Sequence, residues 1–308
     1  MRWSGQPFTE RRPVVFSADD AAAVLAARRI WSTLAGTGDA HAGVVADQLY
    51  ARWWAAPAES GSLPAASHRG SPPLAGRLRV AHSGSGRWIT RCRVIALGAA
   101  GSVVVTTPSG FDRALTQGDH WCPTRPGLPV RVGDEVVGVD RSGGYESEGW
   151  WRTWSGGWDM TRSAPDVSRA YLSVTPAGVE EVPRRLPDAL DGAGIPWTMK
   201  IGVVEGMLAR PDAVVCYVRD ADREAMLALI TSVLGGALAP GPRVPFTSPA
   251  APGLCWAEDP GDGASFGQVR CGLLAGAFES GGAPVPAAEA AFRAAGLDPA
   301  RPHLRSQP

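Results

Sequence analysis

In the run Ile195-Pro196-Trp197-Thr198-Met199-Lys200-Ile201-Gly202-Val203-Val204, apolar residues surround a single cation. This composition predicts a β-strand. Lys200 is the only lysine among the 30 lysine and arginine residues of the 308-residue chain. Arginine stays protonated, whereas a lysine in apolar surroundings can lose its proton and act as a base or nucleophile. Two interpretations stay open: Lys200 has a chemical role that arginine cannot fill, or its stem packs on the strand while its ammonium group reaches water.

The overall composition is that of a globular protein, with 44% hydrophobic and 19% charged residues. The length allows two domains, or one domain with an extension. Because 30 acidic residues balance 30 basic ones, net charge argues against a nucleic-acid partner. No apolar run approaches the roughly 20 residues of a membrane span, and the first residues lack the apolar region of a signal peptide. We therefore expect a cytoplasmic protein with no membrane partner.

Five cysteines fit the same compartment: Cys92, Cys122, Cys216, Cys255 and Cys271. Their number is odd, they are widely spaced, and no pair has the Cys-x-x-Cys spacing. This pattern favours buried thiols in a reducing cytosol over a disulfide framework.

The N-terminal half predicts two kinds of structure. Region 1–75 is expected to hold helices over 17–34 and 43–54, followed by a linker that is rich in proline, serine and glycine. Region 76–140 changes to the two-residue period of strands, which predicts a small β module of the SH3-like kind. Its expected strands cover 77–81, 88–97, 101–106 and 130–139.

A segment rich in tryptophan and glycine follows, with four tryptophans between Trp150 and Trp158. Aromatic rings beside glycines can line a groove for a peptide. The other interpretation is an edge strand that packs these rings into a core. Both stay open on the sequence alone.

The third predicted region, 141–308, is an α+β domain with a mixed or antiparallel sheet flanked by helices. Short apolar runs predict strands, and longer periodic runs predict helices. The expected strands cover 168–174, 195–204, 212–218 and 253–258, and the expected helices cover 176–192, 221–234, a segment from 265, and 284–296. The whole chain is thus predicted to be an α+β protein.

Several kinds of chemistry lack the residues that they need. The five histidines cluster neither with each other nor with the cysteines, so we expect no metal site. Gly261-Asp262-Gly263 is too short and too acidic for a phosphate-binding loop, and no nucleophile elbow is present. We expect no cofactor. What remains is Lys200 with arginines on predicted neighbouring elements: Arg169, Arg219 and Arg270. Arginine forks suit a phosphoryl group, because they are bidentate and permanently charged.

One motif carries a family resemblance: Glu258-Asp259-Pro260, followed by Ser265-Phe266-Gly267-Gln268-Val269-Arg270-Cys271. Together with Tyr171, the run 196–200 and the run 213–218, it resembles the HopA class of type III effectors. The family's actinobacterial relatives include the LxmY-like lyases of class V lanthipeptide and thioamitide biosynthesis. The resemblance is clear over about 145–280.

The resemblance implies a lyase related to phosphothreonine lyases. Such an enzyme removes phosphate from phosphoserine or phosphothreonine of a precursor peptide and leaves a dehydroamino acid. It implies Lys200 as the base that takes the α-proton, Arg270, Arg169 and Arg219 as phosphate ligands, and a separate kinase-like partner protein. Phosphothreonine lyases place a histidine acid close after the lysine, where this chain has Ile201 and Gly202. Either Tyr171 or Tyr217 then donates the proton, or the phosphate, whose second pKa is near 6, leaves without an acid. The alternative function is a non-catalytic subunit that binds the peptide.

Overall fold

The computed structural model describes residues 15–35, 42–56, 73–82, 87–108, 110, 112–140, 145–158, 166–241, 243–261, 263 and 265–306. Contacts group the chain into two compact units: residues 1–53 with 267–308, and residues 54–266. This grouping joins the two ends of the chain, unlike the three consecutive regions expected from the sequence. Most of the predicted linker lies outside the described residues.

The first unit is helical. Its elements are α1 (Ala18–Ala35), α2 (Ala42–Leu49) and α8 (Pro284–Ala294), together with most of α7 (Phe266–Glu279). Ser17 begins α1 as predicted, because its Oγ accepts a hydrogen bond of 3.2 Å from the backbone N–H of Asp20. The rings of Phe16 and Phe292 meet edge to face at 5.0 Å, which joins α1 to α8. The helices predicted for this unit are confirmed. The one predicted over 43–54 ends in a π-helical turn, η1 (Tyr50–Trp54).

The small β module belongs to the second unit. It is a five-stranded antiparallel sheet in the order β3-β2-β1-β5-β4. Its strands are β1 (Arg87–Leu97), β2 (Val103–Thr106), β3 (Asp112–Leu115), β4 (His120–Trp121) and β5 (Glu135–Asp140). The predicted hairpin after β1 is confirmed: β1 pairs with β2, and Ala100 makes the turn with a φ of 52°.

The strand predicted over 77–81 is wrong, because this segment is helix α3 (Leu74–Ala81). Leu74, Ala75 and Leu78 have the spacing of one helix face, and all three pack in the core of the larger sheet. Reading the segment from Gly76 onwards hid this helical period.

The larger sheet has seven antiparallel strands in the order β11-β12-β8-β10-β9-β7-β6. Their bounds are β6 (Tyr145–Ser147), β7 (Trp150–Trp154), β8 (Val167–Leu172), β9 (Trp197–Gly202), β10 (Val214–Arg219), β11 (Ser248–Ala251) and β12 (Leu254–Glu258). Strand β11 lies in the proline-rich segment 240–252, for which the sequence predicts a loop. It tolerates Pro249 because it is an edge strand. The predicted α+β class is confirmed.

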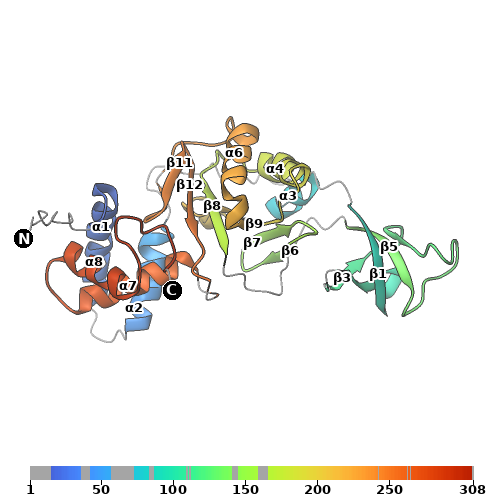
Figure 1. Cartoon of the computed structure of the whole chain (residues 1–308), viewed down its shortest axis with the longest axis horizontal. Coiled ribbons are helices and arrows are strands. Elements are labelled where there is room, and N and C mark those ends of the chain that lie inside the picture. Colours follow the sequence, from blue (N-terminus) through green and yellow to red (C-terminus); the bar gives the residue numbers. More distant parts are fainter. Residues whose placement is uncertain are drawn as a thin grey trace, which may run out of the picture. The chain divides into compact units, whose positions relative to one another are not determined.

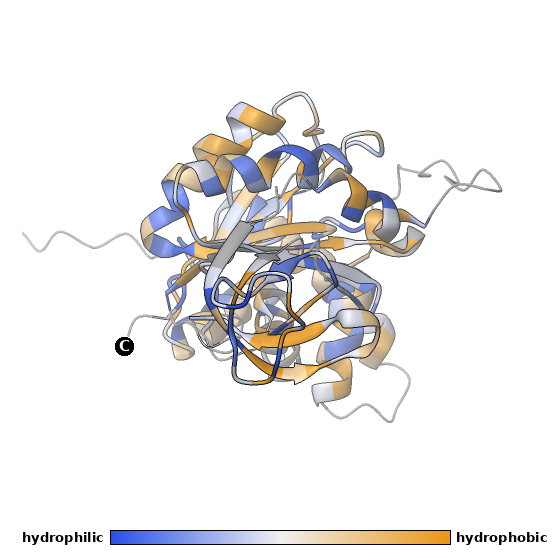
Figure 2. Ribbon diagram, turned by 90° about the vertical axis from the view of Figure 1, so that its right-hand side faces the viewer, coloured by the Kyte–Doolittle hydropathy of each residue, from blue (hydrophilic) through white to orange (hydrophobic). Residues whose placement is uncertain are grey.

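Helices α3, α4 (Glu181–Gly192) and α6 (Arg223–Leu234) cover one face of this sheet (Figure 1). The short helix α5 (Glu205–Leu208) follows β9. Helix α4 begins at Glu181, five residues after the predicted start at Pro176, and it contains Pro187. In Figure 2 the covering helices alternate between hydrophobic and hydrophilic colours, as expected of amphipathic helices with one buried face.

Candidate functional site

The strands of the larger sheet send alternate side chains to its two faces. In β9, Trp197, Met199 and Ile201 enter the core beneath the helices, so Thr198 and Lys200 point to the other side. We call that other side the site face. Applied to β7, β8, β9 and β10, the same alternation assigns to it Trp150, Arg152, Trp154, Arg169, Tyr171, Thr198, Lys200, Val215, Tyr217 and Arg219.

The site face brings together five of the six predicted site residues, four of them in two neighbouring rows across the strands and Arg219 in the row beyond, where it pairs with Val167. One row pairs Lys200 with Val215 and Val215 with Tyr171. The next row pairs Thr198 with Tyr217 and Tyr217 with Arg169. Strands lie about 4.8 Å apart, so roughly 10 Å separates the backbones of Lys200 and Tyr171. Tyr217 is the diagonal neighbour of Lys200, at about 7–8 Å. Of the two tyrosines, Tyr217 therefore lies closer to Lys200.

Lys200 is half-buried, and its Nζ lies 4.2 Å from the centroid of the Trp150 ring. The face of an aromatic ring attracts a cation. The neighbouring Trp151 points the opposite way and is fully buried in the core. The tryptophan-rich segment thus packs one ring into the core and places another against Lys200. A peptide groove along this segment stays a prediction.

Arg169 is buried, with 5% of its surface exposed, and it forms an ion pair with Asp259. Its guanidinium carbon lies 5.3 Å from the centroid of the Tyr217 ring. Burial works to lower the pKa of Arg169, but Tyr171, Tyr217 and Asp259 outweigh it and raise the pKa, so the side chain stays charged. Its Nε is buried and makes no hydrogen bond to the described residues. A buried donor of this kind is satisfied when a ligand supplies an acceptor.

Tyr171 is buried on the same face, and burial raises the pKa of its hydroxyl. The phenol stays protonated at neutral pH, so it can donate a proton or a hydrogen bond but cannot act as a base.

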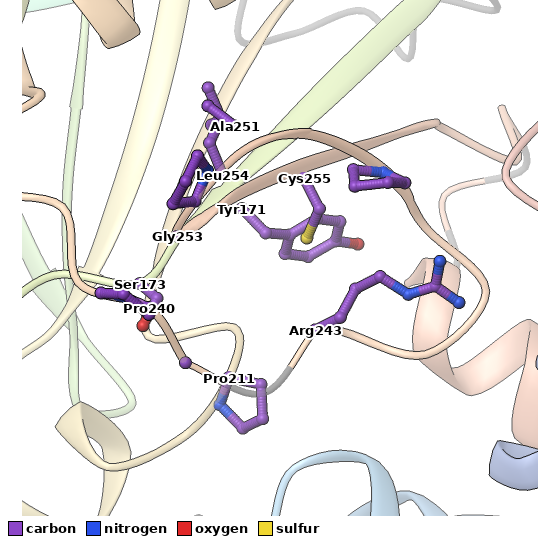
Figure 3. Close-up of a pocket in the computed structure, with 12 residues that line it drawn as sticks. Tyr171, Ser173, Pro211, Pro240, Arg243, Ala251, Gly253, Leu254 and Cys255 are labelled. Carbon is purple, nitrogen blue, oxygen red and sulfur yellow. The ribbon is translucent and has the colours of Figure 1, made fainter. Parts of the chain in front are cut away.

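Tyr171 also lines a cavity of about 230 Å³ between β8, the β11–β12 hairpin and the loop around Arg243. Figure 3 shows the Tyr171 ring beside the Cys255 thiol, with the Arg243 side chain below them. The other walls are mainly proline, glycine and alanine. Burial raises the pKa of the Cys255 thiol, which leaves it protonated and a weak nucleophile. The cavity is therefore apolar, with a few donors at one side.

Arg219 and Arg270 have different surroundings. Arg219 pairs with Asp166 at 3.1 Å, and its guanidinium carbon lies 5.3 Å from the centroid of the Trp158 ring. Arg270 belongs to the other compact unit, where it is 2% exposed. It donates hydrogen bonds to the carbonyl oxygens of Pro302, at 2.8 and 3.2 Å, and of Leu304, at 3.0 Å. These bonds tie the C-terminal segment to α7. A phosphate-binding role for Arg270 stays a prediction.

Sequence reasoning missed Arg152, which β7 places directly opposite Lys200. The signal was present in the alternation of Trp150-Trp151-Arg152-Thr153-Trp154, where Trp150, Arg152 and Trp154 share a face. The pairing of β7 with β9 brings this face beside Lys200, and pairing between distant strands cannot be read from one sequence.

Other groups contribute no further chemistry. Within the described ranges, no three histidine, cysteine or acidic residues are grouped so as to hold a metal ion. His82 contacts Thr153 at 3.1 Å and packs against the Trp151 ring on the helix-covered side. All five cysteines are buried, as predicted. Among the described helices, none combines the length and apolarity that a membrane span requires.

The fold and site define the chain as an α+β protein whose antiparallel sheet carries helices on one face and cations with aromatic rings on the other. Residues 156–304, just under half of the chain, match the HopA1 effector protein family. The match agrees with the predicted resemblance to the HopA class over this part of the chain.

Two solved effector proteins share the fold of nearly the whole chain. The effector from Pseudomonas syringae pv. tomato strain DC3000 is 16% identical, with a TM-score of 0.54 over 94% of this chain and 99% of that one. The effector from Pseudomonas syringae pv. syringae strain 61 is 12% identical, with a TM-score of 0.55 over 95% of this chain and 100% of that one. At these identities the likeness concerns the fold alone. Among curated proteins, none matches the sequence.

Proposed function

We propose that the protein is a lyase that eliminates phosphate from phosphoserine or phosphothreonine in a precursor peptide, leaving a dehydroamino acid. A separate kinase-like protein would supply the phosphorylated peptide. The observation that carries the proposal is the site face, where the only lysine shares one face of the sheet with two tyrosines and a buried arginine. Elimination needs a base, a phosphate ligand and donors in one place, and this face provides residue types for each role.

The proposed reaction begins at Lys200. Its amine, once it has released its own proton to solvent, takes the α-proton of the phosphorylated residue, and the electron pair of that C–H bond forms the Cα–Cβ double bond. The Cβ–O bond breaks, and the phosphate leaves with the bonding electrons. Because the α-proton of a peptide is very weakly acidic, cations and hydrogen-bond donors must stabilise the enolate-like state. The buried Nε of Arg169 is one such donor.

The proposed proton donor to the leaving phosphate is Tyr217, the diagonal neighbour of Lys200. Ile201, one of the two residues where the related lyases place a histidine acid, points into the core and is fully buried. Phosphate has a second pKa near 6 and can also leave without a donor, so a tyrosine need contribute only part of the rate.

The test is the substitution Lys200→Arg, which keeps the positive charge and removes the base. A phosphopeptide of the precursor type is incubated with each protein, and the released phosphate and the mass of the peptide are measured. We expect the variant to eliminate about 10²–10⁴-fold more slowly, the usual contribution of a positioned base. Peptide affinity should survive. Elimination at the wild-type rate would remove Lys200 from the mechanism. An inactive wild-type protein that still binds the peptide would favour the non-catalytic subunit.

A further inference from the structure

Arg152 and Lys200 form an unusual pair on the site face. They lie directly opposite each other on β7 and β9. The Cβ atoms of such partners are about 4.5–5.5 Å apart, and like charges in this position destabilise a sheet. Both side chains are half-buried, so water screens their repulsion less than at an open surface.

Among the described residues, no carboxylate forms an ion pair with either side chain. None of the site-face positions on β7–β10 is acidic. The nearby arginines each have an acid of their own: Arg169 pairs with Asp259, Arg219 with Asp166, and Arg210 with Asp212. By contrast, Arg152 makes no ion pair or hydrogen bond within the described ranges, and Lys200 contacts the Trp150 ring instead of an acid.

The chain has as many acidic residues as basic ones. An acidic residue placed beside Arg152 and Lys200 would neutralise their repulsion. Two opposed cations without an acid are typical of a site that sacrifices stability for binding. A guanidinium presents two parallel N–H donors to a phosphate, while an ammonium acts as a compact point charge. We propose that Arg152 and Lys200 form an anion site for a phosphate monoester, with Arg152 as its main ligand. This inference rests on the proposed function for the identity of the anion.

The stability of Arg152 variants distinguishes an arginine that binds a ligand from one that holds the fold together. If Arg152 were structural, replacing it would destabilise the protein. If Arg152 binds an anion instead, Arg152→Gln removes the repulsion with Lys200. The variant without phosphate is then at least as stable as the wild type without phosphate. Arg152→Glu creates an opposite-charge pair with Lys200 and should raise the melting temperature further.

The experiment measures the melting temperature of the full chain with and without inorganic phosphate, at constant ionic strength. The wild type should melt at a higher temperature in phosphate, because a ligand that binds only the folded state stabilises it. Arg152→Gln and Arg152→Glu should lose this rise. The matched control is Arg184→Gln, which removes one positive charge from an exposed ion pair with Glu181 on α4. It should keep the rise.

A rise of wild-type size in Arg152→Gln would overturn the anion site, and so would a melting temperature well below that of the wild type in the absence of phosphate. Kinetics with the phosphopeptide then separate this inference from the proposed function. Arg152→Gln should raise KM about tenfold or more, the effect of a lost charge-assisted hydrogen bond, with a smaller change in kcat. If Lys200→Arg is inactive while Arg152→Gln has the wild-type KM, the inference alone fails. If Lys200→Arg eliminates normally while the phosphate-dependent rise requires Arg152, the proposed reaction fails and the anion site stands.

Discussion

The two faces of the larger sheet are made of alternate residues from the same strands, yet they have different compositions. Beneath α3, α4 and α6, the strands contribute apolar side chains such as Trp197, Ile201 and Cys216. The site face carries Arg152, Arg169, Tyr217 and the only lysine. Burial of apolar surface explains why the sheet is stable. Opposed cations and a buried donor without a partner do not add stability, and so they point to a ligand. One strand thus serves both the core and the site.

The largest expected effect on stability tests this division within one strand. Ile201→Ala removes a fully buried side chain beneath the helices, and we expect it to lower the free energy of unfolding by about 2–5 kcal/mol. Thr198→Ala, on the site face of the same strand, loses one hydrogen bond to the Thr153 carbonyl oxygen and should cost about 1 kcal/mol. Denaturant unfolding measures both values. If both substitutions lowered the free energy of unfolding by the same amount, the two faces would contribute equally to stability, and the division between core and site face would be wrong.

A smaller effect, on the rate, is expected at the diagonal neighbour of Lys200. Tyr217→Phe keeps the ring and removes the proposed proton donor, so elimination should slow by about 10²-fold. Single-turnover phosphate release measures the rate. Tyr171→Phe is the matched comparison, because Tyr171 lies a further strand away from Lys200 and should affect the rate less. A larger loss in Tyr171→Phe would reverse the assignment of the acid.

At neutral pH the last prediction has no effect on stability; it concerns alkaline pH and the core side of the sheet. Burial raises the pKa of the Cys216 thiol from 9.0 to about 12. The unfolded thiol loses its proton near pH 9 while the folded one keeps it, so the unfolded state binds fewer protons above that pH. Stability should therefore fall as pH rises from about 9 towards 12, by at most about 1.4 kcal/mol per pH unit for this group. Urea unfolding of the wild type and Cys216→Ala across this range measures the slope, which should be shallower in the variant. Equal slopes would exclude Cys216 as the source.

Much of the fold could be predicted, because the strands and helices have clear periods. The strand around Lys200, the strand of Tyr171 and the helix over 223–234 follow from local patterns. Helix α3 does not follow from the local pattern, because residues 77–81 are too few to show a helical period without Leu74 and Ala75. The compact unit formed by both chain ends could not be foreseen, since it depends on contacts between residues far apart in the sequence, such as Phe16 and Phe292.

The sequence indicates which residues belong to the candidate site. It does not indicate how the strands arrange these residues next to one another. Lys200 stood out by composition, and Arg169, Tyr171 and Tyr217 share its face because their strands are neighbours. Arg152 was missed because the register between β7 and β9 is a property of the folded chain. Arg270 has the charge of a phosphate ligand, but its guanidinium donates to backbone carbonyl groups in the other unit.

The central claim is that Lys200 on the site face removes the α-proton of a phosphorylated residue. The most direct measurement compares single-turnover phosphate release from two phosphopeptides that differ only by deuterium at the α-carbon of the phosphoserine. The account predicts slower release from the deuterated peptide with the wild type, and release from both peptides that is about 10²–10⁴-fold slower with Lys200→Arg. Equal rates for the two peptides, together with wild-type release by Lys200→Arg, would contradict it.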